Sequence, residues 1–157
     1  IAVGESYPNI LALRPLIERE IIDVAQPDTG RFGGLLQMKK LAAIAEAHHI
    51  MLAPHDGSLG PVAEMAAVHF LATIPNFLIQ EHLANDVRQR YEVMRGQPDI
   101  VDGHIIVPDT PGLGVDIDEE VIARHPPASN CIPMDEHPEH GYQYVAARMK
   151  RARWLGD

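Results

Sequence analysis

Four short apolar runs in this chain each lead to a side chain that can transfer a proton or bind a metal. The four residues are Glu5, Asp28, His55 and Glu81, and the intervals between them are 23, 27 and 26 residues. Each interval holds about one strand, one helix and a return loop, similar to the ~30 residues of a βαβ unit. Because parallel barrel strands end on one rim, we expect the four side chains to face a shared cavity.

Apolar periodicity predicts an α/β fold with parallel strands, outer helices and right-handed crossovers. Strands are predicted over residues 1–5, 21–25, 50–53 and 77–80, and helices over residues 12–20, 35–48 and 61–72. Within the second of these helices, Met38, Leu41 and Ala45 fall on one face, as expected for a helix that covers a sheet. Pro61 suits the first position of the third helix.

The rest of the chain follows a different pattern. A polar helix is predicted over residues 86–94, an extended stretch over 104–109 and a short helix near Asp118. Residues 126–142 are rich in proline, histidine and acidic side chains, without apolar periodicity. We therefore predict a barrel region over residues 1–125 and a C-terminal extension over 126–157 that packs on the barrel or on a cap.

Length and charge narrow the function classes. The 157 residues fall short of the ~250 of a complete eight-stranded barrel, and the chain opens inside an apolar run, so we expect part of a longer protein. A net charge of −9 argues against a nucleic-acid or anionic-membrane surface. The single cysteine, Cys131, forms no internal disulfide, and no run reaches the ~18 apolar residues of a membrane span. The expected location is the cytoplasm.

His55 is the candidate for proton transfer, because an imidazole with a pKa near ~6.5 acts as acid or base at neutral pH. Asp28 would orient the ring and stabilise its charged form. Asp56 and Ser58, in the loop after His55, are candidate substrate contacts. The glycines Gly30, Gly33 and Gly34 lack the spacing of a nucleotide fingerprint, so no nucleotide cofactor is expected.

Five segments in this order, IAVGE, QPD, APH, IQE and PGLGVDIDEE, resemble the C-terminal barrel half of the enolase superfamily. The similarity covers residues 1–123 and is to the mandelate racemase and muconate lactonizing enzyme branch, which includes the galactonate-type sugar-acid dehydratases. It implies the C-terminal half of a modified (β/α)8 barrel whose capping domain and first four strands lie upstream.

The same resemblance implies roles for the rim residues. Glu5 would be the third Mg²⁺ ligand, at the end of strand five, while Asp28 and His55 would end strands six and seven. Glu81 would end strand eight and, as a protonated acid, would donate a hydrogen bond to an enediolate. The two other metal ligands would lie upstream.

The expected function is Mg²⁺-dependent dehydration of an aldonate-type sugar acid to a 2-keto-3-deoxy acid by a homo-oligomeric lyase. The identity of the acid stays open, because residues 29–32 differ from the histidine-containing stretch of the galactonate-type group. Two alternatives also stay open: a racemase or epimerase of a 2-hydroxy acid that uses the same site, and a non-catalytic barrel piece that completes a partner.

Overall fold

The computed structural model describes residues 1–83 and 88–125, without the side chains of Ser58 and Gln89. The chain divides into two compact units, Ile1–Ile122 and Ala123–Asp157. The predicted extension over 126–157 lies outside the described residues. The first unit contains all the predicted site residues.

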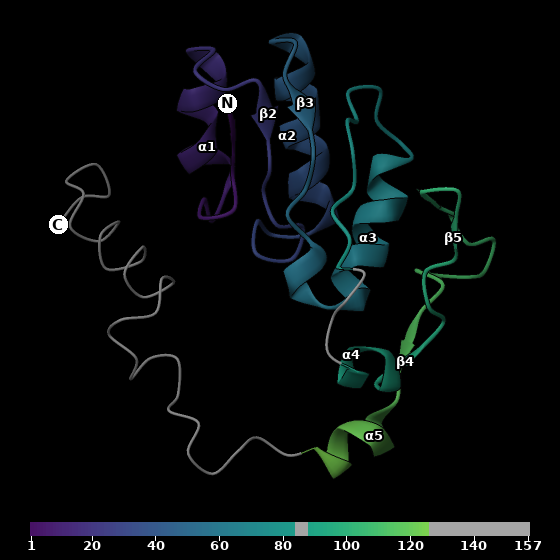
Figure 1. Cartoon of the computed structure of the whole chain (residues 1–157). Coiled ribbons are helices and arrows are strands. Elements are labelled where there is room, and N and C mark those ends of the chain that lie inside the picture. Colours follow the sequence, from purple (N-terminus) through teal and green to yellow (C-terminus); the bar gives the residue numbers. More distant parts are fainter. Residues whose placement is uncertain (84–87, 126–157) are drawn as a thin grey trace, which may run out of the picture. The chain divides into compact units, whose positions relative to one another are not determined.

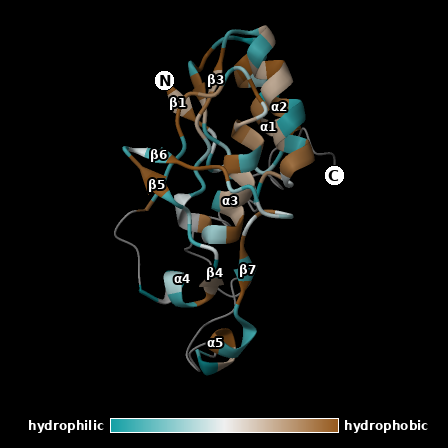
Figure 2. Ribbon diagram, turned by 90° about the vertical axis from the view of Figure 1, so that its right-hand side faces the viewer, coloured by the Kyte–Doolittle hydropathy of each residue, from teal (hydrophilic) through white to brown (hydrophobic). Residues whose placement is uncertain are grey.

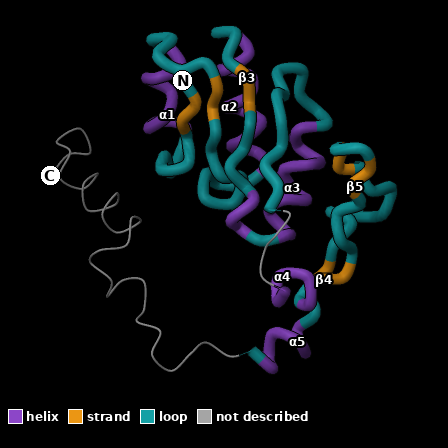
Figure 3. Tube along the Cα trace, viewed as in Figure 1, coloured by secondary structure: helices purple, strands orange, loops and turns teal. Residues whose placement is uncertain are grey.

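Three parallel strands form the sheet of the first unit (Figure 3). They are β1 (Ala2–Val3), β2 (Val24–Ala25) and β3 (Met51–Leu52), in that order across the sheet. Val3 aligns with Ala25, and Ala25 aligns with Leu52. The predicted α/β fold with parallel strands is confirmed, although each strand is shorter than its apolar run.

The expected fourth strand over residues 77–80 is reduced to one parallel bridge, between Leu52 and Phe77. Two hydrogen bonds flank it: the Leu52 N–H donates to the Asn76 carbonyl and the Leu78 N–H to the Leu52 carbonyl. Leu78 and Ile79 are largely exposed. Among the residues that the structure describes, no strand pairs with the other side of this segment, so its ladder stops after the first contact. The prediction of a full strand was wrong here.

Three helices lie on one face of the strands (Figures 1 and 2). They are α1 (Ile10–Glu18), α2 (Leu35–Ala47) and α3 (Pro61–Leu71). The Asn9 side chain caps α1 by accepting from the Ala12 N–H at 3.1 Å, and Pro61 occupies the first turn of α3.

An apolar core fills the space between these helices and the sheet. On α2, Met38, Leu41 and Ala45 are fully buried, as the helical periodicity predicted. They pack in one cluster with Ala25 and Leu52 from the strands. The burial of this face holds the helices against the sheet. The packed helices in turn hold the strands in place, and so position the carboxyl end of each strand.

The part of the first unit after residue 87 is built from short elements. They are α4 (Arg88–Glu92), β4 (Met94–Arg95), β5 (Ile100–Val101), β6 (His104–Ile105), β7 (Asp116–Ile117) and α5 (Glu119–Arg124), whose last residues enter the second unit. The strands pair antiparallel, β4 with β7 and β5 with β6. The Asp118 carboxylate caps α5 by accepting from the Glu120 and Val121 N–H groups. Within the described ranges, no helix has the length and apolar character needed to cross a membrane.

Candidate active site

The strand register places the predicted rim residues at one end of the sheet. Glu5 comes two residues after Val3, Asp28 three after Ala25, and His55 three after Leu52, and these three strand positions are aligned across the sheet. Glu81 comes four residues after Phe77, the partner of Leu52. All four side chains therefore follow the carboxyl ends of neighbouring parallel segments.

His55 and Asp28 form the central contact of this rim. The His55 Nδ1 atom lies 2.9 Å from the Asp28 Oδ1 atom. The sheet ladder continues into this site, because the His55 N–H donates to the Pro27 carbonyl at 3.2 Å. An ionised carboxylate only accepts hydrogen bonds, so the contact assigns the ring proton to Nδ1 and leaves the Nε2 lone pair free to act as a base.

Two further carboxylates surround the imidazole. Glu81 Oε1 lies 3.8 Å from His55 Nε2, and Glu5 Oε1 lies 3.9 Å from His55 Nδ1. The His55 side chain is 26% exposed, so it lies at an accessible surface. The structure thus brings together all four rim residues that were predicted from the sequence.

This environment changes the proton affinity of both central groups. Burial by itself lowers the pKa of His55, but the hydrogen bond to Asp28 and the charges of Glu81 and Glu5 together raise that pKa above its usual value. Burial raises the pKa of Asp28, against the opposing effects of the His55 hydrogen bond and the Arg31 guanidinium. His55 is therefore a stronger base than a free imidazole.

Asp56, a predicted substrate contact, is fully buried. Its carboxylate accepts from the Thr29 N–H at 2.6 Å and from the Thr29 hydroxyl at 2.5 Å. Both oxygens are thus used to tie the loop after His55 to the loop after Asp28. Burial raises the pKa of Asp56 to about 6. In this arrangement Asp56 holds the rim together through Thr29, and its role as a substrate contact stays a prediction. Ser58, the other predicted contact, has no described side chain.

Two glycines allow close approaches beside the rim. A Cβ atom on Gly4 would lie 2.4 Å from the Gln26 carbonyl carbon and 2.5 Å from the Pro27 nitrogen, so no larger residue fits before Glu5. A Cβ on Gly57 would lie 3.2 Å from Glu81 Cγ. The Gly57 N–H donates to Glu81 Oε2 at 3.1 Å, and this bond holds Glu81 on the side of His55 Nε2.

The donor set for a metal is incomplete in this chain. Glu5 offers a carboxylate with a half-exposed side chain, a hard oxygen ligand of the kind that Mg²⁺ prefers. Residues 1–83 and 88–125 contain no group of three or more histidine, cysteine or acidic side chains arranged to hold a metal ion. Glu5 fits as a single ligand, and the described residues do not form a closed site.

Sequence reasoning missed four residues that organise the rim. Arg31 donates to Asp28 Oδ2 at 2.5 Å, and its position three residues later in the turn was an available signal. Thr29 had no signal besides its position next to Asp28. Glu64 and Arg90 form a buried ion pair at 2.9 Å, and Arg90 also donates to the Gly57 carbonyl. Their separation of 26 residues gave no local pattern to find.

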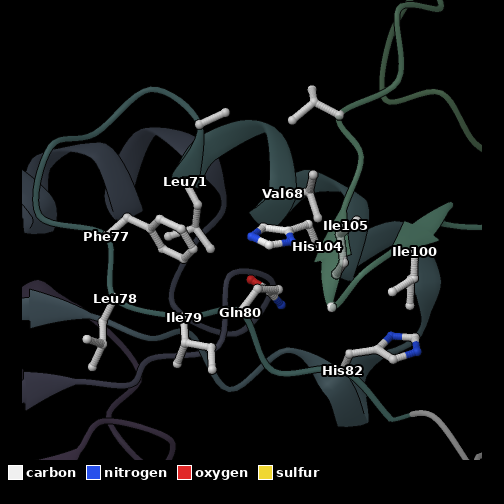
Figure 4. A pocket seen from close by; sticks show the side chains of 13 residues that line it. Val68, Leu71, Phe77, Leu78, Ile79, Gln80, His82, Ile100, His104 and Ile105 are labelled. Carbon is white, nitrogen blue, oxygen red and sulfur yellow. The ribbon is translucent and has the colours of Figure 1, made fainter.

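The described part of the chain also contains an apolar cavity of about 540 Å³ (Figure 4). Its walls include Val68 and Leu71 of α3, Phe77, and Ile100 and Ile105 of the β5–β6 hairpin. None of the four rim residues lines it. Such a lining offers little to a carboxylate-bearing, hydroxylated substrate, so the rim and not this cavity is the candidate active site.

The enolase C-terminal domain-like family matches residues 1–121. The chain belongs to this family. Its membership accounts for the parallel strands and identifies the fold as the C-terminal half of an enolase-superfamily barrel.

Similar proteins place the chain in the mandelate racemase and muconate lactonizing enzyme branch of the superfamily. A D-mannonate dehydratase of Caulobacter vibrioides is 35% identical over 136 residues, which cover 86% of this chain and 34% of that protein. A D-galactonate dehydratase family member of Streptomyces bingchenggensis is 34% identical, with coverages of 85% and 33%. The chain thus spans about a third of the length of these curated relatives.

Solved structures of family members superpose well. An enolase from Pantoea ananatis with bound D-gluconate and Mg gives a TM-score of 0.72 at 34% identity, covering 79% of this chain and 30% of that one. A putative L-alanine-DL-glutamate epimerase from Burkholderia xenovorans, bound to magnesium and fumarate, gives 0.75 at 34% identity, with coverages of 82% and 32%. Both similarities support the same fold.

Proposed function

We propose that this chain supplies the proton-transfer half of an enzyme that dehydrates an aldonate-type sugar acid to a 2-keto-3-deoxy acid. One observation carries the proposal: the hydrogen bond from Nδ1 to Asp28 leaves His55 Nε2 free, 3.8 Å from Glu81 Oε1, at the carboxyl ends of the strands. The names of the dehydratase relatives support this substrate class.

In the proposed reaction, His55 Nε2 takes the proton alpha to the substrate carboxylate. The C–H bonding electrons move into the carboxylate as an enediolate. They then form the double bond between the alpha and beta carbons as the C–O bond breaks, and the beta hydroxyl leaves as water after taking a proton from the His55 imidazolium. The enol product tautomerises to the 2-keto-3-deoxy acid. Asp28, held by Arg31, keeps the ring oriented and stabilises the imidazolium that forms.

Glu81 and Glu5 take the two remaining roles. Glu81 acts on the enediolate as the acid form that arises during the reaction. Because Glu81 Oε2 accepts from the Gly57 N–H, Oε1 is the oxygen placed to donate that hydrogen bond. Glu5 contributes one carboxylate ligand to Mg²⁺, whose positive charge stabilises an enediolate when the ion is bound. The solved relative with bound D-gluconate and Mg supports a sugar-acid ligand and a magnesium ion for this proposal.

We further propose that the working enzyme is a cytoplasmic homo-oligomer, in which a cap and a first barrel half complete the site around the sugar acid. The coverage of about a third of each curated relative supports a contribution from residues beyond this chain. Closed symmetry, which is common among soluble enzymes, supports the oligomer.

The test uses the full-length protein that contains this chain, supplied with Mg²⁺ and a panel of aldonates in deuterated water. The parent protein should form a keto acid. The His55→Asn variant should lose both keto-acid formation and exchange of the alpha proton, because Asn provides no base. Exchange at the parent rate in His55→Asn would remove His55 from the proposed role.

Epimerisation is the second candidate, favoured by the structural similarity to the putative epimerase at a TM-score of 0.75. In that reaction His55 would still remove the alpha proton, but a base on the opposite face would return it and no hydroxyl would leave. Product analysis separates the two functions. An inverted acid without keto acid would replace dehydration by epimerisation.

A further inference from the structure

Behind the rim lies a second charged group, here named the strut, which consists of Glu64, His82 and Arg90. Glu64 is in the first turn of α3 and Arg90 in α4, and their side chains are 1% and 6% exposed. Arg90 Nη2 donates to Glu64 Oε2 at 2.9 Å. None of the three residues belongs to the proposed reaction.

The strut reaches Glu81 by two separate routes. Arg90 Nη1 donates to the Gly57 carbonyl at 2.8 Å, and the Gly57 N–H donates to Glu81 Oε2 at 3.1 Å. His82, the residue after Glu81, places its Nδ1 atom 2.5 Å from Glu64 Oε1. One buried carboxylate therefore holds the chain immediately after Glu81 and, through Arg90, the glycine that binds the Glu81 side chain.

The energetics of such a pair favour positioning over stabilisation. A buried ion pair recovers its desolvation cost only with excellent geometry, and apolar residues of similar volume are often as stabilising. The ion pair fixes the orientation of the two groups that it joins, because the planar guanidinium bridges the Glu64 carboxylate and the Gly57 carbonyl at fixed angles. The hydrogen bond from the Gly57 N–H to Glu81 Oε2 transmits a displacement of Gly57 to the Glu81 carboxylate.

We propose that Glu64 and Arg90 are positioning residues that hold the Glu81 carboxylate beside His55 Nε2. The inference rests on the proposed function, because it assumes that Glu81 acts on the reacting acid. Loss of the strut should allow Glu81 to move by about 1 Å, a displacement that costs on the order of a hundredfold in rate. Since this contact matters most as the enediolate forms, kcat should fall while KM changes little.

The experiment uses three variants of the full-length protein with Mg²⁺. The Glu64→Gln/Arg90→Met double variant removes both buried charges and keeps the side-chain volumes. Arg90→Lys keeps the charge but not the planar fork. Gly57→Ala leaves the ion pair intact and places a Cβ 3.1 Å from Leu83 Cγ and 3.2 Å from Glu81 Cγ, so it presses on the segment that holds Glu81. Arg88→Met is the matched control, because Arg88 lies on the same helix in an exposed ion pair with Glu92.

We expect kcat to fall about a hundredfold in the double variant, about tenfold in Arg90→Lys and about tenfold in Gly57→Ala, with KM within about twofold. Arg88→Met should match the parent. A double variant that folds and keeps the parent kcat would overturn the proposal. If that variant does not fold, Arg90→Lys and Gly57→Ala decide, and parent kcat in both would be equally fatal.

Crystal structures of the parent, Arg90→Lys and Gly57→Ala proteins provide a readout that does not depend on activity. The proposal requires the Glu81 carboxylate to move away from His55 Nε2 in Arg90→Lys, and an unmoved carboxylate in that variant would overturn it. If the parent protein dehydrates no sugar acid, the proposed function fails, while these structures still decide whether the strut positions Glu81.

Discussion

The rim and the strut contain the same arrangement, a carboxylate between an arginine and a histidine, in two different settings. In the rim, Asp28 contacts Arg31 and His55, and in the strut, Glu64 contacts Arg90 and His82. The settings differ in what the histidine meets next. His55 has carboxylates near both ring nitrogens, whereas His82 lines the apolar cavity.

The arginines differ in the same direction. The Arg31 side chain is 31% exposed, while the Arg90 side chain is 6% exposed. The rim therefore keeps an accessible histidine whose pKa its neighbours raise, and the strut uses its charges to fix backbone. A histidine–carboxylate contact therefore does not by itself mark a catalytic site. The exposure of the histidine and the charges around it distinguish the rim from the strut.

Exchange of each histidine for asparagine should give the largest difference between the rim and the strut, in the rate of alpha-proton exchange. His55→Asn should lower the rate of alpha-proton exchange by about a thousandfold, as expected for loss of a general base. His82→Asn should lower it by roughly tenfold, through a less well-placed Glu81. Deuterium incorporation followed by NMR checks both values. Equal losses in the two variants would mean that the rim and the strut share one role.

Removal of the arginine should lower the folding stability more at the strut than at the rim, whereas removal of the histidine affects the rate more at the rim. Arg90→Met leaves Glu64 buried without its guanidinium and should reduce the free energy of unfolding by about 3–5 kcal/mol. Arg31→Met should cost less, about 1 kcal/mol, because Arg31 is partly exposed and the buried Asp28 keeps its hydrogen bond to His55. Urea unfolding of the full-length variants measures the difference. A greater loss in Arg31→Met would contradict the assignment of the strut as the buried pair.

Asp56 should make part of the stability depend on pH. Its folded-state pKa of about 6 lies above the ordinary value of 3.8, so the folded protein binds this proton more tightly than the unfolded chain does. The resulting stabilisation is complete below about pH 4 and is lost as the pH rises through about 6, a change of about 3 kcal/mol.

Asp56→Asn removes this dependence. The difference in the free energy of unfolding between parent and variant, measured by urea titration from pH 4 to pH 8, should change by that amount. Parallel curves for the two proteins would show that Asp56 does not titrate in this range.

The smallest expected effect concerns the carboxylates around His55. Glu81→Gln should lower the pKa of His55, because a charge that raises this pKa is removed. Glu46→Gln, on an exposed position of α2, is the matched control and should leave that pKa in place. NMR titration of the imidazole in protein freed of divalent cations provides the measurement. An unchanged pKa in Glu81→Gln would place Glu81 farther from the ring than 3.8 Å.

The rim could be predicted from the sequence because each of its residues is marked by the few residues that precede it. An apolar run that leads to Asp28 or His55 is visible in a few letters, and parallel register then aligns the ends without further input. The same logic predicted α2 and its buried face. Each of these features depends on the order of residues within one strand, one helix or one turn.

The features that the sequence did not predict depend on tertiary neighbours. Asp56 was a candidate substrate contact by its place in the loop after His55, and its bond to the Thr29 N–H at 2.6 Å depends on a loop 27 residues away. Glu64 resembled an ordinary acidic residue at a helix start, and only α4 makes it a buried partner of Arg90. The segment over residues 77–80 had the composition of a strand, but its backbone pairs with the sheet only at the Leu52–Phe77 bridge, which local composition does not reveal.

The exposed side of that segment has a practical consequence. Phe77, Leu78 and Ile79 are 44%, 50% and 63% exposed, and within the described residues no strand pairs with the side of this segment that faces away from Leu52. Such an edge pairs readily with copies of itself, and transient pairing of this kind seeds aggregates. Expression of residues 1–157 by themselves should therefore give inclusion bodies, and biochemical work should begin with a polypeptide that covers this edge.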